Sequence, residues 1–93
     1  MNNDAIHLHG LHQAAWQARF VDRNQLRVAA DEILRSASPD SVYEAHGHFH
    51  LAACAWQNNQ HERARVERIE AARLYERLGD AALGPQLVEG AIE

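Results

Sequence analysis

The sequence predicts an all-α domain built from two antiparallel helical hairpins and a short C-terminal capping helix. Alanine supplies much of the 46% hydrophobic content, whereas Phe, Trp and Tyr together reach only 6%. Because alanine loses no side-chain entropy in a helix, this composition favours helices. With two prolines and five glycines, the chain has too few turn residues for a β-sandwich or barrel. A chain of 93 residues is one domain (1–93) with a thin core.

The first hairpin is predicted over residues 4–37. Its first helix runs from about Asp4 to Phe20, and its second begins after the N-cap candidate Asp22. Apolar residues recur at three- and four-residue spacing in both helices, as Leu8, Leu11, Ala15 and Ala18 and then as Leu26, Ala30, Ile33 and Ala37. This spacing places each set on one helix face, which we expect to be buried.

The second hairpin is predicted over residues 39–79. We expect Ser38 to cap its first helix, with Pro39 at the first helical position. The apolar stripe of that helix is Val42, Ala45, Phe49, Ala52 and Trp56. Asn58-Asn59 form the predicted turn, and the second helix runs from about Gln60 to Leu78, with Gly79 ending it. A capping helix is predicted over about 81–92.

The chain repeats itself after a displacement of about forty residues. Ala15-Trp16-Gln17 then falls on Ala55-Trp56-Gln57, and Leu11 falls on Leu51. A chance match between two alanine-rich helices is the alternative explanation. We favour a repeat because both halves are predicted to form the same helix-turn-helix unit.

The second unit resembles a tetratricopeptide repeat. Leu51-Ala52 stand where that family has a Leu-Gly pair, and Ala64 and Ala71 match its two small residues. Arg68 and Glu76 depart from the pattern, since a large apolar residue and a proline are usual there. The resemblance implies a protein-binding scaffold of helical hairpins and brings no catalytic residues. Such arrays need three or more repeats for stability, so two units indicate a dimer or a variant fold.

The charge distribution argues against a nucleic-acid or membrane partner. The net charge is −4, and the chain contains nine arginines and no lysine. Arginine and glutamate alternate at helical spacing in residues 61–77, as in Arg63–Glu67 and Glu70–Arg73, which predicts a solvated, self-paired face. The N-terminus lacks the features of a signal peptide, and the longest apolar run, 51–56, is too short to span a membrane. A lone cysteine offers no intrachain disulfide, so we expect a cytoplasmic protein.

Histidines are the residues most suited to chemistry. Six of the seven form two groups, His7, His9 and His12 in the first and His46, His48 and His50 in the second. Residues three or four apart share a helix face, so His9 with His12 and His46 with His50 form pairs. Stacked hairpins would bring these pairs together as a four-ligand site for Zn, Cu, Ni, Fe or haem. Glu44, four residues before His48, is a candidate to orient that ring.

Two other interpretations of the histidines stay open at this point. They are ordinary surface or interface residues, or they form an interface that responds to pH near neutrality. Cys54 lies in the apolar run and is predicted to be a core residue rather than a nucleophile. The sequence contains no phosphate-binding glycine loop, serine elbow or zinc-protease motif. No catalytic residue is therefore predicted.

The sequence thus predicts a non-enzymatic interaction module that self-associates, as a homo-oligomer such as a dimer, and binds a protein or peptide. Its binding face would be formed by the first helix of each hairpin. Trp16, Phe49 and Trp56 are the candidate partner-binding residues, since aromatic side chains dominate binding energy at interfaces. A metal- or haem-binding helical protein is the alternative function.

Overall fold

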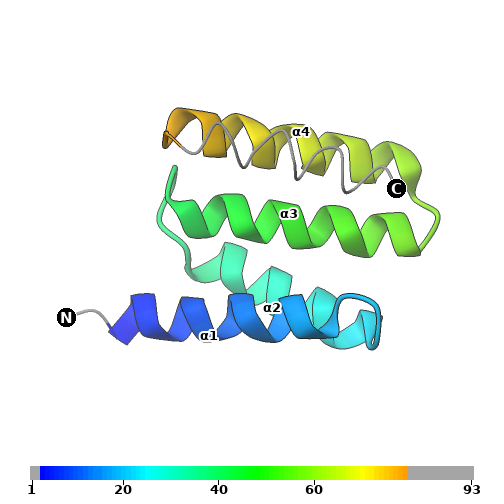
Figure 1. Ribbon diagram of the computed structural model, residues 1–93, viewed down its shortest axis with the longest axis horizontal. Coiled ribbons are helices and arrows are strands. Elements are labelled where there is room, and N and C mark those ends of the chain that lie inside the picture. The colour runs from blue at the N-terminus through cyan, green and yellow to red at the C-terminus, as the bar shows by residue number, and fades with distance from the viewer. Residues whose placement is uncertain (1–2, 80–93) are drawn as a thin grey trace.

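The computed structural model of the chain describes residues 3–79, which form four α-helices and, in that range, no strand. The helices are α1 (Asn3–Ala18), α2 (Arg23–Ser36), α3 (Val42–Gln57) and α4 (His61–Arg77). They pair as two antiparallel hairpins, which confirms the all-α prediction (Figure 1). The predicted capping helix over about 81–92 lies outside the described residues.

The two hairpins form an open stack and not a closed four-helix bundle. The central helix α3 packs against α1, α2 and α4, and α2 also packs against α1. Among residues 3–79, α4 packs against neither α1 nor α2. Figure 1 shows α4, α3 and α1 in that order across the molecule. Within residues 3–79, no helix covers the face of α3 that lies between α1 and α4.

Most helix ends lie where the local sequence predicts them. Asp22 caps α2, where its Oδ1 accepts a hydrogen bond of 3.1 Å from the backbone N–H of Gln25. The turn after α3 is made by Asn58 and Asn59, and Asn59 has a φ of 63°. After α4, Gly79 has a φ of 92°, the left-handed conformation that ends many helices. These three predictions are confirmed.

The predicted start of α3 is wrong by three residues. Its N-cap is Ser41, whose Oγ accepts from the backbone N–H of Glu44, and Pro39 lies outside the helix. The reason is Asp40, whose φ of 62° interrupts any helix that begins at Ser38. The Glu44 carboxylate also accepts a 2.6 Å hydrogen bond from the Asp40 N–H. Ser41 and Glu44 have the spacing of a capping box, a signal present in the sequence.

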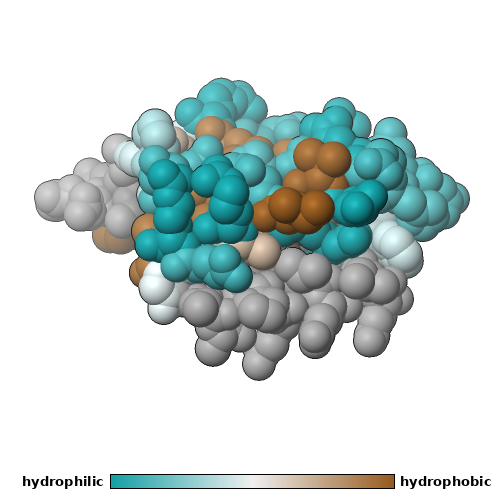
Figure 2. Space-filling model, turned by 90° about the horizontal axis from the view of Figure 1, so that it is seen from above, coloured by the Kyte–Doolittle hydropathy of each residue, from teal (hydrophilic) through white to brown (hydrophobic). Residues whose placement is uncertain are grey.

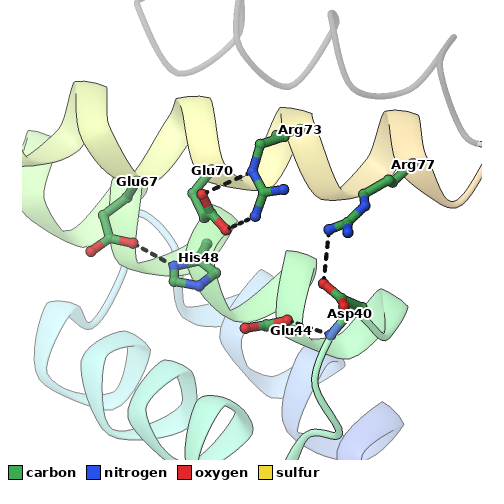
Figure 3. Close-up of polar contacts among 7 residues, drawn as sticks. All are labelled: Asp40, Glu44, His48, Glu67, Glu70, Arg73 and Arg77. Atoms are coloured by element: carbon green, nitrogen blue, oxygen red, sulfur yellow. Dashed lines mark hydrogen bonds and ion pairs between the residues drawn. The ribbon is translucent and has the colours of Figure 1, made fainter.

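A second helix holds this loop in place. Nη1 of Arg77, the last residue of α4, donates to Oδ1 of Asp40 at 3.0 Å (Figure 3). The left-handed residue before α3 is thus tied to the end of α4. This long-range ion pair is one feature that local sequence patterns do not contain.

Small side chains let the helices approach closely. One buried cluster, which joins the two hairpins, consists of Ala15, Ala18, Leu26, Ala29, Ala53 and Cys54. A second cluster between α3 and α4 consists of Ala45, Phe49, Ala71, Leu74 and Tyr75. Cys54 is buried, as predicted for a core residue. The core is thin because alanines occupy most of its positions, and each contributes little apolar area.

The outer face of α4 combines ion pairs with apolar side chains. The predicted pairs are present: Arg63 Nε donates to Glu67 at 2.8 Å, and Arg73 Nε donates to Glu70 at 3.2 Å. Seen from the α4 side, Figure 2 shows an apolar patch among hydrophilic residues, and α4 exposes 54% of Val66 and of Ile69. None of the helices in residues 3–79 has the length and hydrophobicity to span a membrane. Self-association stays a prediction.

Candidate functional site

The uncovered face of α3 forms the floor of a groove of about 460 Å³. Five of its lining residues come from α1, two from α3 and one from α4, namely His9, His12, Gln13, Trp16, Gln17, His46, Phe49 and Tyr75. The α1 residues recur at three- and four-residue spacing, which places them on one helix face. Because α1 and α4 do not pack together, the space between them remains open above α3.

Three histidines pack against one another in and beneath this groove. The rings of His12 and His46 are stacked, with centroids 3.9 Å apart and planes 10° apart. A 2.8 Å hydrogen bond joins Nδ1 of His12 to Nε2 of His50. Nδ1 of His46 is hydrogen-bonded to the hydroxyl of Tyr75 on α4. The cluster therefore links all three helices that form the groove.

Burial keeps these imidazoles uncharged at neutral pH. His50 is fully buried, and this burial lowers its pKa to about 3, with further lowering by His12, His46 and Arg19. Burial also lowers the pKa of His46 to about 4, helped by the charges of His12 and His9. The pKa of His12 is lowered by burial first and by His9 second. Two stacked imidazolium rings would repel each other, so the packed arrangement favours the neutral forms.

The four candidate metal ligands are brought to one region, but their nitrogens do not converge. His9 is the outermost, with its ring centroid 6.4 Å from that of His12. The stacked rings of His12 and His46 place their lone pairs in nearly parallel planes. Nδ1 of His12 is hydrogen-bonded to His50, and Nδ1 of His46 to Tyr75. In residues 3–79, no group of three or more His, Cys, Asp or Glu side chains is arranged to hold a metal ion. Binding of Zn, Cu, Ni, Fe or haem stays a prediction.

His48 belongs to a separate network on the α3–α4 surface. Its Nδ1 is hydrogen-bonded to Oε1 of Glu67 at 2.6 Å (Figure 3). Oε2 of the same carboxylate accepts from Arg63 at 2.8 Å. The hydrogen bond to Glu67 raises the pKa of His48, and the same bond lowers the pKa of Glu67. The predicted partner Glu44 makes no hydrogen bond to His48, because its carboxylate accepts from the Asp40 N–H, but its charge adds to the raised pKa of His48.

Replacing Glu67 with glutamine is expected to destabilise the protein. Glu67 is only 8% exposed and accepts two hydrogen bonds from ionisable groups, so Glu67→Gln is expected to cost about 1–2 kcal/mol at pH 7. The matched control is Glu70→Gln, whose carboxylate pairs with Arg73 near the surface and is worth about 0–1 kcal/mol. Urea unfolding of both variants measures the difference. Equal losses would contradict the structural role assigned to Glu67.

The groove also has an aromatic end. Trp16 is 51% exposed and stacks on Phe49, which is 3% exposed, with ring centroids 5.8 Å apart. The Arg19 guanidinium lies over both rings, 4.7 Å from the Trp16 centroid and 4.8 Å from the Phe49 centroid. Phe49 therefore forms the floor, whereas Trp16 faces solvent at the mouth of the groove.

The third candidate partner-binding residue does not line this groove. The Trp56 ring packs edge-on against His61, with centroids 4.5 Å apart, at the α3–α4 turn. Three lining residues that the sequence did not mark as site residues are Gln13, Gln17 and Tyr75, and Arg19 beside the groove is a fourth residue of this kind. Tyr75 lines the groove from α4 and is hydrogen-bonded to His46, which lies 29 residues earlier in the sequence. Comparison with known protein families, curated proteins and solved structures found no match to this chain.

Proposed function

We propose that this protein is a non-enzymatic interaction module that binds a peptide segment of a protein partner in the groove over α3. The observation that carries the proposal is the exposed Trp16 ring above a buried Phe49, beside an open volume of about 460 Å³. Tryptophan is enriched among the residues that dominate binding energy at protein interfaces. The groove has room for one large apolar side chain of a partner, which would pack against these rings.

The electrostatics of the groove support binding rather than catalysis. A general base works best when its pKa lies near the operating pH. His46, with a pKa of about 4, and His50, with a pKa of about 3, hold protons too weakly for that role near pH 7. Both rings are also engaged in hydrogen bonds within the fold. As uncharged rings, they provide a surface against which an apolar side chain of the partner would pack.

Selection of peptides against the folded chain tests this proposal. Twelve-residue peptides selected from a random library are expected to share one large apolar residue. Trp16→Ala should weaken their binding at least tenfold, a loss of about 1.4 kcal/mol or more. Trp56→Ala, the matched control outside the groove, should change affinity less than threefold. Isothermal titration measures both, with circular dichroism confirming that each variant is folded.

The opposite pattern would overturn the proposal. Peptides that bind the Trp16→Ala variant as tightly as the parent chain would show that the groove is not the binding face. Peptides that lose affinity with Trp56→Ala instead would place the binding face at the α3–α4 turn.

A further inference from the structure

Arg19 lies at the aromatic end of the groove with an unused donor. Its guanidinium rests on the rings of Trp16 and Phe49 and lies 5.1 Å from the centroid of the Phe20 ring, which is 79% exposed. Its Nε is buried without a hydrogen-bond partner, and it makes no ion pair with any residue in the part of the chain that the structure describes. A buried donor left unpaired costs about 1–3 kcal/mol. The Nη groups of Arg19 likewise have no hydrogen-bond or ion-pair partner among residues 3–79, and these are the donors that a ligand carboxylate would use.

Among residues 3–79, no acidic side chain pairs with Arg19. Residues 5–21 include no Asp or Glu, and none of the residues that line the groove is acidic. The next acidic residue along the chain, Asp22, accepts a hydrogen bond from the start of α2 and caps that helix. Although the chain has a net charge of −4, the described residues thus place no negative charge at this end of the groove.

The backbone at Arg19 is held in place from α3. The side chain of Gln57 donates a hydrogen bond from its Nε2 to the Arg19 carbonyl oxygen. The three aromatic rings limit the movement of the guanidinium at the other end of the residue. A preorganised guanidinium loses less side-chain entropy when it binds an acceptor.

We infer that the groove selects partner segments in which a glutamate or aspartate side chain lies next to a large apolar residue, and that Arg19 binds this carboxylate. The inference rests on the proposed function, because the apolar residue is the one that fills the groove. The planar N–H fork of arginine matches the two oxygens of a carboxylate. A cationic side chain does not fit this end, since the aromatic faces that would attract it already hold Arg19.

Two blocked dipeptides separate the carboxylate from the apolar anchor. N-acetyl-Glu-Phe-amide and N-acetyl-Gln-Phe-amide have nearly the same shape and differ only in charge. Amide and indole N–H resonances of the full chain, followed by NMR during titration, give both dissociation constants. We expect the Glu peptide to bind about tenfold more tightly, or about 1.4 kcal/mol, with both peptides shifting the Trp16 indole signal.

Variants assign the preference to Arg19. Arg19→Gln should bring the two dissociation constants within twofold of each other. Arg65→Gln, the matched control on the exposed face of α4, should leave the tenfold preference intact. If Arg19→Gln does not fold, Arg19→Lys keeps a positive charge but loses the planar fork, and the preference should then fall to threefold or less.

The outcomes distinguish this inference from the proposed function. Equal binding of both peptides at Trp16, or a preference that survives in the folded Arg19 variant, would overturn the role of Arg19 and leave the apolar groove as a binding site. If neither peptide shifts the Trp16 signal, both the inference and the proposed function are overturned.

Discussion

Lowering the pH from 7 to 4.5 is expected to destabilise the protein strongly. His46 and His50 have folded-state pKa values of about 4 and about 3, against 6.5 for an unperturbed histidine. The unfolded chain therefore binds protons that the folded chain does not. The contribution of His46 and His50 to stability is present in full above pH 6.5. It is lost as the pH falls towards their folded-state pKa values. Between pH 6.5 and 4.5 each residue contributes a loss on the order of 2–3 kcal/mol, a large share of the stability of a small domain.

His12 acts in the same direction, because burial lowers its pKa as well, whereas His48 and Glu67 act in the opposite direction or outside this window. The pKa of His48 is raised, so its stabilising effect is present in acid and is lost as the pH rises through its folded-state value. The pKa of Glu67 is lowered from 4.5, so its contribution is lost only below the histidine window. The loss of stability from His46 and His50 together exceeds the loss from either residue alone, because burial lowers the pKa of both.

Urea unfolding at pH 7.0, 5.5 and 4.5 measures this loss. Replacing His46 with glutamine should reduce the slope of stability against pH, because one titrating group is removed. His7→Gln, at an exposed position on α1, is the control and should retain the parent slope. Stability that is constant or rises between pH 7 and pH 4.5 would show that the folded chain takes up protons at the clustered histidines as readily as the unfolded chain does.

A side chain at Gly47 is expected to have an effect of similar size. A Cβ at this position would lie 2.6 Å from both Cγ and Cδ2 of Leu34, and 3.2 Å from Cγ2 of Ile33. The contact joins α3 to α2, so relief requires Leu34 to move or the hairpins to separate. Gly47→Ala gains about 1 kcal/mol of helix propensity but costs more through overpacking, for a net loss of about 1–2 kcal/mol. Gly47→Val should lose about 3 kcal/mol.

Gly10 is the matched control for this prediction. It lies inside α1, and a Cβ there would have no heavy atom within 4 Å. Gly10→Ala should therefore stabilise the protein by about 0.5–1 kcal/mol, since only the helix propensity changes. Chemical denaturation of Gly47→Ala, Gly47→Val and Gly10→Ala compares the free energies of unfolding at the two glycine positions. A stabilising Gly47→Ala would mean that Leu34 adjusts without cost and that α2 and α3 do not depend on this close approach.

Helix positions were largely predictable because helix formation depends on nearby residues. The cap at Asp22, the asparagine turn and Gly79 each act within a few residues of their own position. The start of α3 was placed wrongly because Ser38-Pro39 and Ser41 are both acceptable local signals. The choice between them involves Asp40, whose carboxylate pairs with Arg77 across 37 residues.

The candidate site was predictable only in part. Helical spacing placed His9 with His12 and His46 with His50, and these residues do meet across the two hairpins. Spacing could not show that the His12 and His46 rings stack, or that His50 is fully buried with a pKa near 3. Both properties depend on how closely α1 approaches α3.

The sequence by itself determined four amphipathic helices, their turns and a thin alanine-rich core, because these follow from propensity, spacing and capping within each segment. Only the tertiary structure decided that α4 packs on α3 without reaching α1. That arrangement opens the groove, exposes Trp16 above Phe49 and leaves Arg19 without an acidic partner in the described residues. The physical reason is that packing between helices far apart in sequence sets which side chains are buried, which are neutral and which remain available to a partner.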